Sequence, residues 1–307
     1  MAKNKKYQHL LKPLLIQDGP EGIYPEPRIW MESKDLEGFN GHFSYGFIKE
    51  AGIFHPIKGS LVHPYDECLV FAGIDTNDFF SLGAEISILL GEEQEEHIIN
   101  EPSLVVIPKG MPHGPVTVRK VDKPCAHYLI GLSAEFKATF VPQKQSNKTS
   151  DLKYGHLIKK MKDAEVRHDS GKVKMGPGNA DNLAWFFSDK LEGLEVNVSW
   201  GHYSSPGIWH RGAEGVEEGS YFRDVHSHPE EEALIFVGLD PNDLSYFGAE
   251  CQGGLGEEEE IIVHNVPSVV IAPSGLPHGP AITRWVDKPF GFIVFSLSGA
   301  HESTWAK

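Results

Sequence analysis

Short hydrophobic segments separated by turn residues recur along the whole chain. The segments are rich in Val, Ile, Leu and Phe, and clusters of Gly, Pro, Asn and Asp interrupt them at intervals of about 8–12 residues. Clear examples are residues 67–74, 85–90, 104–110, 116–120 and 127–133. This spacing predicts an all-β fold, either a sandwich or a barrel.

Helical periodicity is weak by comparison. The best candidates are residues 7–15 and 154–167, where apolar positions recur at helical spacing. We expect a few short helices in these two segments, packed on the outside of the β-structure.

The chain contains two copies of one pattern. The matched stretches are, at an offset of 165, residues 63–85 with 228–250 and 102–124 with 267–289, and, at an offset of 155, residues 43–55 with 198–210. Such a duplication predicts two similar domains, residues 1–145 and 146–307, with a polar linker at about residues 143–152.

Two acidic runs occupy matching places in the repeat. They are residues 91–97 and 256–260, and both begin with a glycine followed by glutamates. Runs of like charge between strands are typical of solvated hairpins, so we predict hairpins here rather than calcium sites.

Length and charge limit the possible partners. With 307 residues the chain is long enough for two domains, each with its own core. A net charge of −15 repels nucleic acid backbones and anionic membrane surfaces, so we expect neither as a partner. No apolar run reaches the roughly 18 residues of a membrane span, and no signal-peptide segment follows the basic start, which favours a cytoplasmic protein. The three cysteines lack metal or redox spacing and should be reduced.

The second copy carries side chains suited to a transition metal. Residues two apart in a strand point to the same face, so His226 and His228 share a face, and Glu232 keeps the same parity four positions later. A tight turn predicted at residues 273–275 precedes His278, which we expect on the next inward-facing strand. Imidazole and carboxylate groups are ligands for divalent transition metals.

These residues carry a resemblance to a known family. His226, His228 and Glu232 fit the spacing His-x-His-x3-Glu, and the turn with His278 fits Pro-x-Gly-x2-His. Together they resemble the two signature motifs of the cupin superfamily, and the duplication resembles a bicupin. The resemblance implies two tandem jelly-roll β-barrels, and it implies that the three histidines and the glutamate bind one metal ion with positions left open for water or substrate. Mn or Fe is the expected metal, with Zn and Ni as alternatives.

The first copy departs from the motif. Leu61 stands where His226 would fall, while His63, Glu67 and His113 remain at the other ligand positions. Two histidines and one carboxylate are the minimum ligand set of some non-haem iron sites, so a second metal is one interpretation. The other interpretation, which we favour from the sequence, is a site that lost a ligand and now serves structure or dimer contact.

Other polar residues are candidates for catalysis. Glu250 follows a barrel strand, at the position that Glu85 holds in the first copy, and either lines the pocket or faces solvent. His202, Tyr203 and His210 come from the segment that leads into the metal motif. They either donate hydrogen bonds to substrate oxygens or pack in the core or on the surface.

The ligand set favours an enzyme. A metal held by three neutral imidazoles and one carboxylate keeps a net positive charge and attracts enolates, catecholates and carboxylates. We therefore expect cleavage or rearrangement of a C–C bond in a small phenolic, β-diketone-like or hydroxy acid substrate, by a dioxygenase, hydrolase or decarboxylase reaction.

Two other functions stay open at this point, a non-catalytic binding or storage cupin and a sugar isomerase or epimerase. The sequence holds no dinucleotide fingerprint after a strand and no phosphate loop, which disfavours nucleotide cofactors. Association into a homodimer through barrel edges is compatible with the acidic surface.

Overall fold

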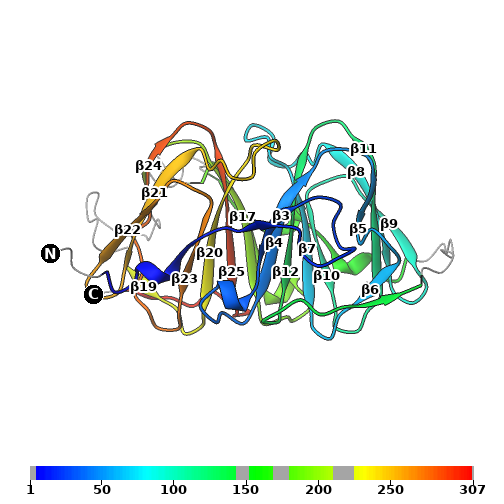
Figure 1. Ribbon diagram of the computed structural model, residues 1–307, viewed down its shortest axis with the longest axis horizontal. Coiled ribbons are helices and arrows are strands. Elements are labelled where there is room, and N and C mark those ends of the chain that lie inside the picture. Colours follow the sequence, from blue (N-terminus) through cyan, green and yellow to red (C-terminus); the bar gives the residue numbers. More distant parts are fainter. Residues whose placement is uncertain (1–4, 143–151, 169–179, 210–224, 306–307) are drawn as a thin grey trace. The chain divides into compact units, whose positions relative to one another are not determined.

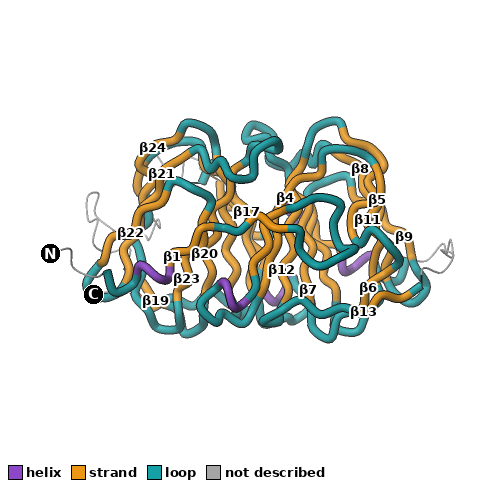
Figure 2. Tube along the Cα trace, in the orientation of Figure 1, coloured by secondary structure: helices purple, strands orange, loops and turns teal. Residues whose placement is uncertain are grey.

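The computed structural model describes residues 5–142, 152–168, 180–209 and 225–305. Strands dominate these residues, and the helices among them are 3-10 turns of three residues each, drawn as short purple segments in Figure 2. The turns are η1 (Gln8–Leu10), η2 (Ser33–Asp35), η3 (Gly155–Leu157), η4 (Met161–Asp163) and η5 (Ser188–Lys190). The prediction of an all-β fold with few short helices is confirmed.

In the two candidate helical segments, the helices are limited to short 3-10 turns followed by strands. Residues 7–15 form the single turn η1 and then the strand β1 (Leu11–Pro13). Residues 154–167 begin with η3, which leads directly into the strand β14 (Ile158–Lys160). Both strands pair with the edge of a sheet, which supplies backbone hydrogen bonds that a short isolated helix cannot match.

The described chain separates into two compact units. The first barrel consists of Leu15–Ala164 with Lys190–Leu194, and the second barrel consists of Met1–Leu14, Glu165–Asp189 and Glu195–Lys307. Each unit therefore contains one copy of the repeat. The units differ from the two halves of the sequence mainly because the segment that opens each copy belongs to the unit of the other copy.

Two sheets build the first barrel. The larger has the strand order β14, β10 (Ser103–Ile107), β7 (Glu67–Ala72), β12 (Cys125–Gly131), β4 (His42–Ile48), β3 (Arg28–Met31) and β2 (Ile16–Gln17). The smaller has the order β13 (Thr139–Val141), β6 (Ser60–Val62), β11 (His113–Val121), β8 (Ala84–Leu90) and β9 (Glu95–Ile99), and β5 (Gly52–His55) also pairs with β11. Every strand pair in them is antiparallel, as in jelly-roll barrels.

The second barrel repeats this arrangement (Figure 1). Its larger sheet has the order β1, β23 (Ser268–Ala272), β20 (Glu232–Gly238), β25 (Phe290–Ser296), β17 (Asn197–Tyr203), β16 (Asn182–Phe186) and β15 (Glu165–His168). A second sheet has the order β18 (Gly207–Ile208), β24 (Ile282–Val286), β21 (Ala249–Leu255) and β22 (Glu260–His264). The short strands β19 (His226–Ser227) and β26 (Thr304–Trp305) pair with each other.

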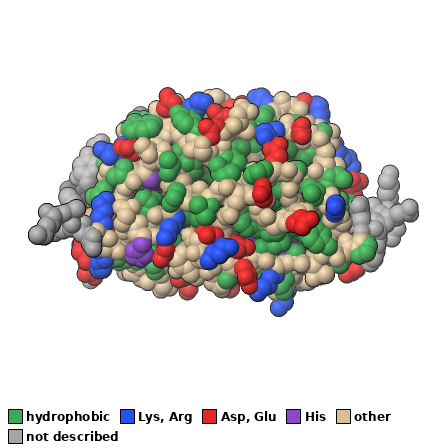
Figure 3. Space-filling view, in the orientation of Figure 1, with side chains coloured by type: hydrophobic (Ala, Val, Ile, Leu, Met, Phe, Trp, Pro, Cys, Tyr) green, Lys and Arg blue, Asp and Glu red, His purple; other side chains and the backbone are tan. Residues whose placement is uncertain are grey.

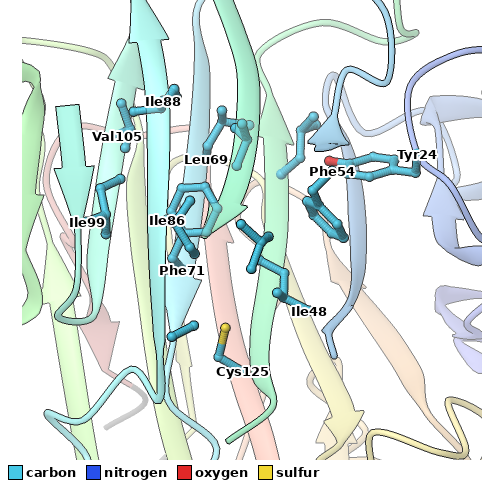
Figure 4. Close-up of a cluster of buried hydrophobic side chains, with 14 of the residues drawn as sticks. Tyr24, Ile48, Phe54, Leu69, Phe71, Ile86, Ile88, Ile99, Val105 and Cys125 are labelled. Carbon is cyan, nitrogen blue, oxygen red and sulfur yellow. The ribbon is translucent and has the colours of Figure 1, made fainter. Parts of the chain in front are cut away.

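Apolar side chains from both sheets fill the first barrel (Figure 4). Leu69 and Phe71 of β7 and Ile86 and Ile88 of β8 are completely buried. Burial of each such side chain contributes about 1.5–3 kcal/mol to the stability of the barrel.

The opening segment of each sequence copy completes the barrel of the other copy. Strand β14, which opens the second copy, pairs with β10 of the first barrel, and β1, which opens the chain, pairs with β23 of the second barrel. This exchange explains why Met1–Leu14 belongs to the second barrel and why the first barrel extends to Ala164.

In the first barrel the acidic run of residues 91–97 receives the exchanged segment. Glu95 accepts the backbone N–H groups of Lys153 at 2.8 Å and Tyr154 at 2.9 Å, and the Tyr154 hydroxyl donates to Glu93 at 2.7 Å. The ring of Tyr154 lies against Gly91, where a Cβ atom would be only 2.2 Å from it. The prediction of a solvated hairpin is therefore wrong for Glu95, which is 3% exposed.

The second barrel uses the same contacts. Glu260 accepts the backbone N–H groups of Lys6 at 2.6 Å and Tyr7 at 3.1 Å, and the Tyr7 hydroxyl donates to Glu258 at 3.1 Å. The ring of Tyr7 lies against Gly256 in the way that Tyr154 lies against its glycine. Both acidic runs are thus docking points for a Lys-Tyr dipeptide.

The surface carries charges of both signs. In Figure 3, Lys and Arg side chains lie among Asp and Glu side chains and between hydrophobic patches. In the part of the chain that is described, none of the helices has the length and apolar character needed to cross a bilayer.

Candidate metal centre

The second barrel brings its four motif residues to one point. His226 lies in β19, Glu232 begins β20, and His278 lies between β23 and β24. The backbones of His226 and His278 are joined by two hydrogen bonds, of 3.0 Å and 2.8 Å. This bridge fixes the two histidines, which are 52 positions apart in the sequence, side by side.

The distances are those of a ligand cluster. Oε2 of Glu232 lies 3.4 Å from Nε2 of His278 and 3.6 Å from Nε2 of His228. Ligand atoms of His226, His228 and His278 all lie within 4.8 Å of one another. These four residues are called the second-barrel cluster below.

Backbone carbonyls orient two of the imidazoles. Nδ1 of His228 lies 2.7 Å from the carbonyl oxygen of Glu302, and Nδ1 of His278 lies 3.0 Å from that of Leu276. A carbonyl can only accept, so each Nδ1 carries the proton and each Nε2 presents a lone pair toward Glu232 when the ring is neutral. Nitrogen lone pairs that face a carboxylate repel it, and a cation or a proton between them removes this repulsion.

The charges of the cluster shift its pKa values. Burial alone raises the pKa of Glu232, but the hydrogen bond and charge of His278, with the charge of His228, lower it to about 2. Burial lowers the pKa of His278, yet its contact with Glu232 more than offsets this and raises the pKa overall. The carboxylate is therefore ionised and ready to bind a cation.

His301 also joins this site, although sequence analysis did not select it. Its Nδ1 lies 3.8 Å from Oε1 of Glu232, and its ring centroid lies 4.3 Å from that of His228. In the repeat it stands where the first copy has Phe136. That difference between aligned copies was the signal that could have revealed it.

The first barrel brings together the residues that keep the motif there. Oε2 of Glu67 lies 3.4 Å from Nε2 of both His63 and His113. His55, which sequence analysis also missed, has a ligand atom within 4.8 Å of those of Glu67 and His113. His55 ends the first-copy stretch of residues 43–55, and its counterpart in the second copy is the candidate His210. The alignment of the copies therefore contained a signal for His55.

These first-barrel side chains are more deeply buried than those of the second barrel. His55, Glu67 and His113 are 0% exposed and His63 is 1% exposed. Burial lowers the pKa of His55 well below its usual range, and neighbouring His127 lowers it further. The ring is therefore neutral, which is the form of imidazole that binds metals.

Glu250 is not brought to the second-barrel cluster. It forms an ion pair of 2.9 Å with Arg284, whose side chain is 48% exposed. The neighbouring residues Ala249 and Cys251 are buried instead, as expected where a strand alternates between interior and exterior.

Strand pairing places His202 and Tyr203 on opposite faces of β17. Glu232 pairs with Ser296, which pairs with Asn197, and directly paired residues share a face of the sheet. Tyr203 keeps the parity of Asn197 and lies on the face of Glu232, but roughly 20 Å further along the strand at about 3.3 Å per residue. His202 lies on the opposite face, away from the cluster.

Tyr203 has partners of its own. Its ring stacks on Trp209 at 4.1 Å and on Phe290 at 5.2 Å. These contacts belong to the aromatic interior of the second barrel. His210 lies outside the described residues.

No protein-family model matches this sequence, and no curated protein matches it. Solved structures do match. Three are variants of oxalate decarboxylase from Bacillus subtilis, each 10% identical to this chain: one with a tryptophan replaced by phenylalanine (TM-score 0.62), one with an arginine replaced by alanine (0.61) and one with a serine replaced by alanine (0.59). The first two matches cover 96% of this chain and 78% of the other, and the third covers 91% and 74%.

This chain has the bicupin fold. The likeness at 10% identity concerns the fold, and it confirms the duplicated cupin barrel that the motifs predicted. In this fold the two motif-bearing regions form the clusters described above, one in each barrel.

Proposed function

We propose that this bicupin is a divalent-metal-dependent enzyme that cleaves or rearranges a C–C bond in a small oxygen-rich substrate. The observation that carries the proposal is the convergence of the second-barrel cluster, in which three imidazoles lie around a buried carboxylate. Such a set is expensive to bury without a cation, and its nitrogen and oxygen donors suit first-row transition metals such as Mn, Fe, Zn and Ni.

The fold neighbours support the reaction class. Oxalate decarboxylase, as its name states, removes carbon dioxide from a small dicarboxylate, which breaks a C–C bond. A bound metal would supply a Lewis acid that holds and polarises substrate oxygens. Oxalate, β-diketones, polyphenols and hydroxy acids all offer oxygens for this contact.

The chain's own residues would hold and select the substrate. The carbonyls of Glu302 and Leu276 keep two imidazoles in one orientation, so the ligands are preorganised. His226 and His301 are partly exposed, so we place substrate entry on their side of the cluster. His301, next to Glu232, is the group we assign to proton transfer.

Of the other predicted catalytic residues, Glu250, His202 and Tyr203 have no part in this proposal. Glu250 is engaged by Arg284, His202 lies on the opposite sheet face, and Tyr203 is packed among aromatic rings. The assignment of His210 stays a prediction.

The test is an assay of metal-loaded protein against oxalate, β-diketones, polyphenols and hydroxy acids, with and without oxygen. We expect turnover of one class, and we expect His278→Ala to lower it at least about 100-fold through loss of the metal. His9→Ala, a change at an exposed histidine, is the matched control. Oxygen uptake would identify a dioxygenase, while binding without turnover would favour a storage cupin. Full activity in His278→Ala would refute the proposal.

A further inference from the structure

The first barrel contains a second cluster whose ligand set differs from the motif. Leu61 pairs with His113 in β6 and β11, just as His226 pairs with His278 in the second barrel. The strand register thus confirms that Leu61 occupies the structural place of His226. An aliphatic side chain cannot bind a metal, so the motif alone leaves this barrel one ligand short.

His55 reaches the same cluster from another strand. It ends β5 and pairs with Val116 of β11, three residues beyond His113. Its ring centroid is 6.3 Å from that of His113, and its ligand atom lies within 4.8 Å of those of His113 and Glu67. A third imidazole is therefore present, although it comes from outside the motif.

Several buried polar atoms in this cluster make no hydrogen bond, although Oε2 of Glu67 lies 3.4 Å from Nε2 of both His63 and His113. Both ring nitrogens of His55 and both carboxylate oxygens of Glu67 are buried and make no hydrogen bond to the described residues. Buried polar groups are almost always satisfied, and a neutral imidazole leaves a donor and an acceptor to be matched. Four unmatched atoms in one place indicate a bound species, and their chemistry is that of metal ligands.

The remaining two imidazoles are already oriented. Nδ1 of His63 donates to the carbonyl of Lys137 at 2.7 Å, so its Nε2 presents a lone pair to Glu67. Nδ1 of His113 points to the carbonyl of Met111 at 3.3 Å, and its Nε2 also faces Glu67. The carbonyl contacts match those that orient His228 and His278 in the second barrel.

The spacing of the donor atoms is close to that of a metal shell. Two donors that bind one ion at about 2.1 Å lie at most about 4.2 Å apart. Donor atoms of His55, Glu67 and His113 lie within 4.8 Å of one another, and Nε2 of His63 lies 3.4 Å from Oε2 of Glu67, so small side-chain movements would bring them around one ion.

We infer that the first barrel holds a second divalent transition metal through His55, His63, Glu67 and His113, with His55 replacing the ligand that Leu61 removes. All four side chains are 0–1% exposed, which leaves no route for substrate. The site is therefore structural, and its metal exchanges slowly, because closed coordination shells are typical of structural metal sites.

The test is elemental analysis of the full chain after reconstitution with Mn(II), Zn(II) or anaerobic Fe(II), followed by desalting. We expect about two metal ions per chain in the wild type and about one in His55→Ala and in His278→Ala. The double variant His55→Ala/His278→Ala should bind none. His9→Ala, at an exposed position, should keep two.

A rescue variant separates loss of a ligand from loss of folding. In His55→Ala/Leu61→His the motif of the second barrel is rebuilt in the first, at a position whose register already faces His113. We expect it to bind two ions again. The inference would be overturned if the wild type bound one ion and His278→Ala bound none. It would also be overturned if His55→Ala still bound two ions. Because the count requires no substrate, it stands or falls independently of the proposed reaction.

Discussion

The two barrels arrange the same kind of cluster in different surroundings. In the first, His55, His63, Glu67 and His113 are all buried, and Phe136 packs its ring 5.2 Å from that of His63. In the second, the equivalent position holds His301, 4.3 Å from His228, and His226 is partly exposed. An apolar cover suits a metal that is kept, whereas a polar, accessible edge suits a metal that meets substrate.

The comparison extends to groups around the clusters. Nδ1 of His42 donates to the carbonyl of Ser133 at 2.8 Å, and the amide of Asn197, its repeat counterpart, donates to the carbonyl of Ser298 at 2.9 Å. Duplication therefore preserved the hydrogen bond while the side chain changed.

The largest expected effect tests whether the interiors are equivalent. Phe71 and Phe236 hold the same repeat position and are 0% and 5% exposed. We expect Phe71→Ala and Phe236→Ala each to lower the free energy of unfolding by about 3–5 kcal/mol, because each leaves a cavity in a packed core. Urea unfolding followed by fluorescence measures this. A cost below about 1 kcal/mol for one of them would show that its barrel is loosely packed.

A smaller effect tests the exchanged segments. Glu95→Ala should lower the free energy of unfolding by about 1–3 kcal/mol, because two backbone N–H groups lose their buried acceptor. Glu260→Ala should cost less, about 1 kcal/mol, because Glu260 is more exposed. Hydrogen exchange at Tyr154 and Tyr7 would report the same loss locally. Equal protection in wild type and variants would mean that the strands β14 and β1 hold the segments unaided.

The smallest expected effect concerns the residue that packs beside each cluster, Phe136 in the first barrel and His301 in the second. His301→Phe gives the second barrel the side chain of the first, and we expect metal affinity there to fall about tenfold because a polar neighbour of Glu232 is lost. The fold should be unchanged, since Phe is the side chain that the first barrel has at this place. Competition with a coloured chelator measures the affinity. Unchanged affinity together with unchanged turnover would remove His301 from the site.

Several features followed from the sequence because they depend on local spacing. Strands with period two, a repeat at constant offset and the pattern of His226, His228 and Glu232 can each be read without knowing which segments meet. The structure places these three beside His278, and it places Leu61 in the register of His226, as alignment of the copies predicted.

The tertiary structure decided which segments that are distant in the sequence contact one another. The spacing of residues did not indicate that His55 reaches the first cluster, that His301 reaches the second, or that each opening segment docks on the barrel of the other copy. The spacing also could not decide which of His202 and Tyr203 lies on the sheet face of the cluster, because the pairing of the strand with its neighbours determines this. Local sequence specifies which way successive side chains alternate, and only sheet pairing specifies which of the two faces becomes the interior.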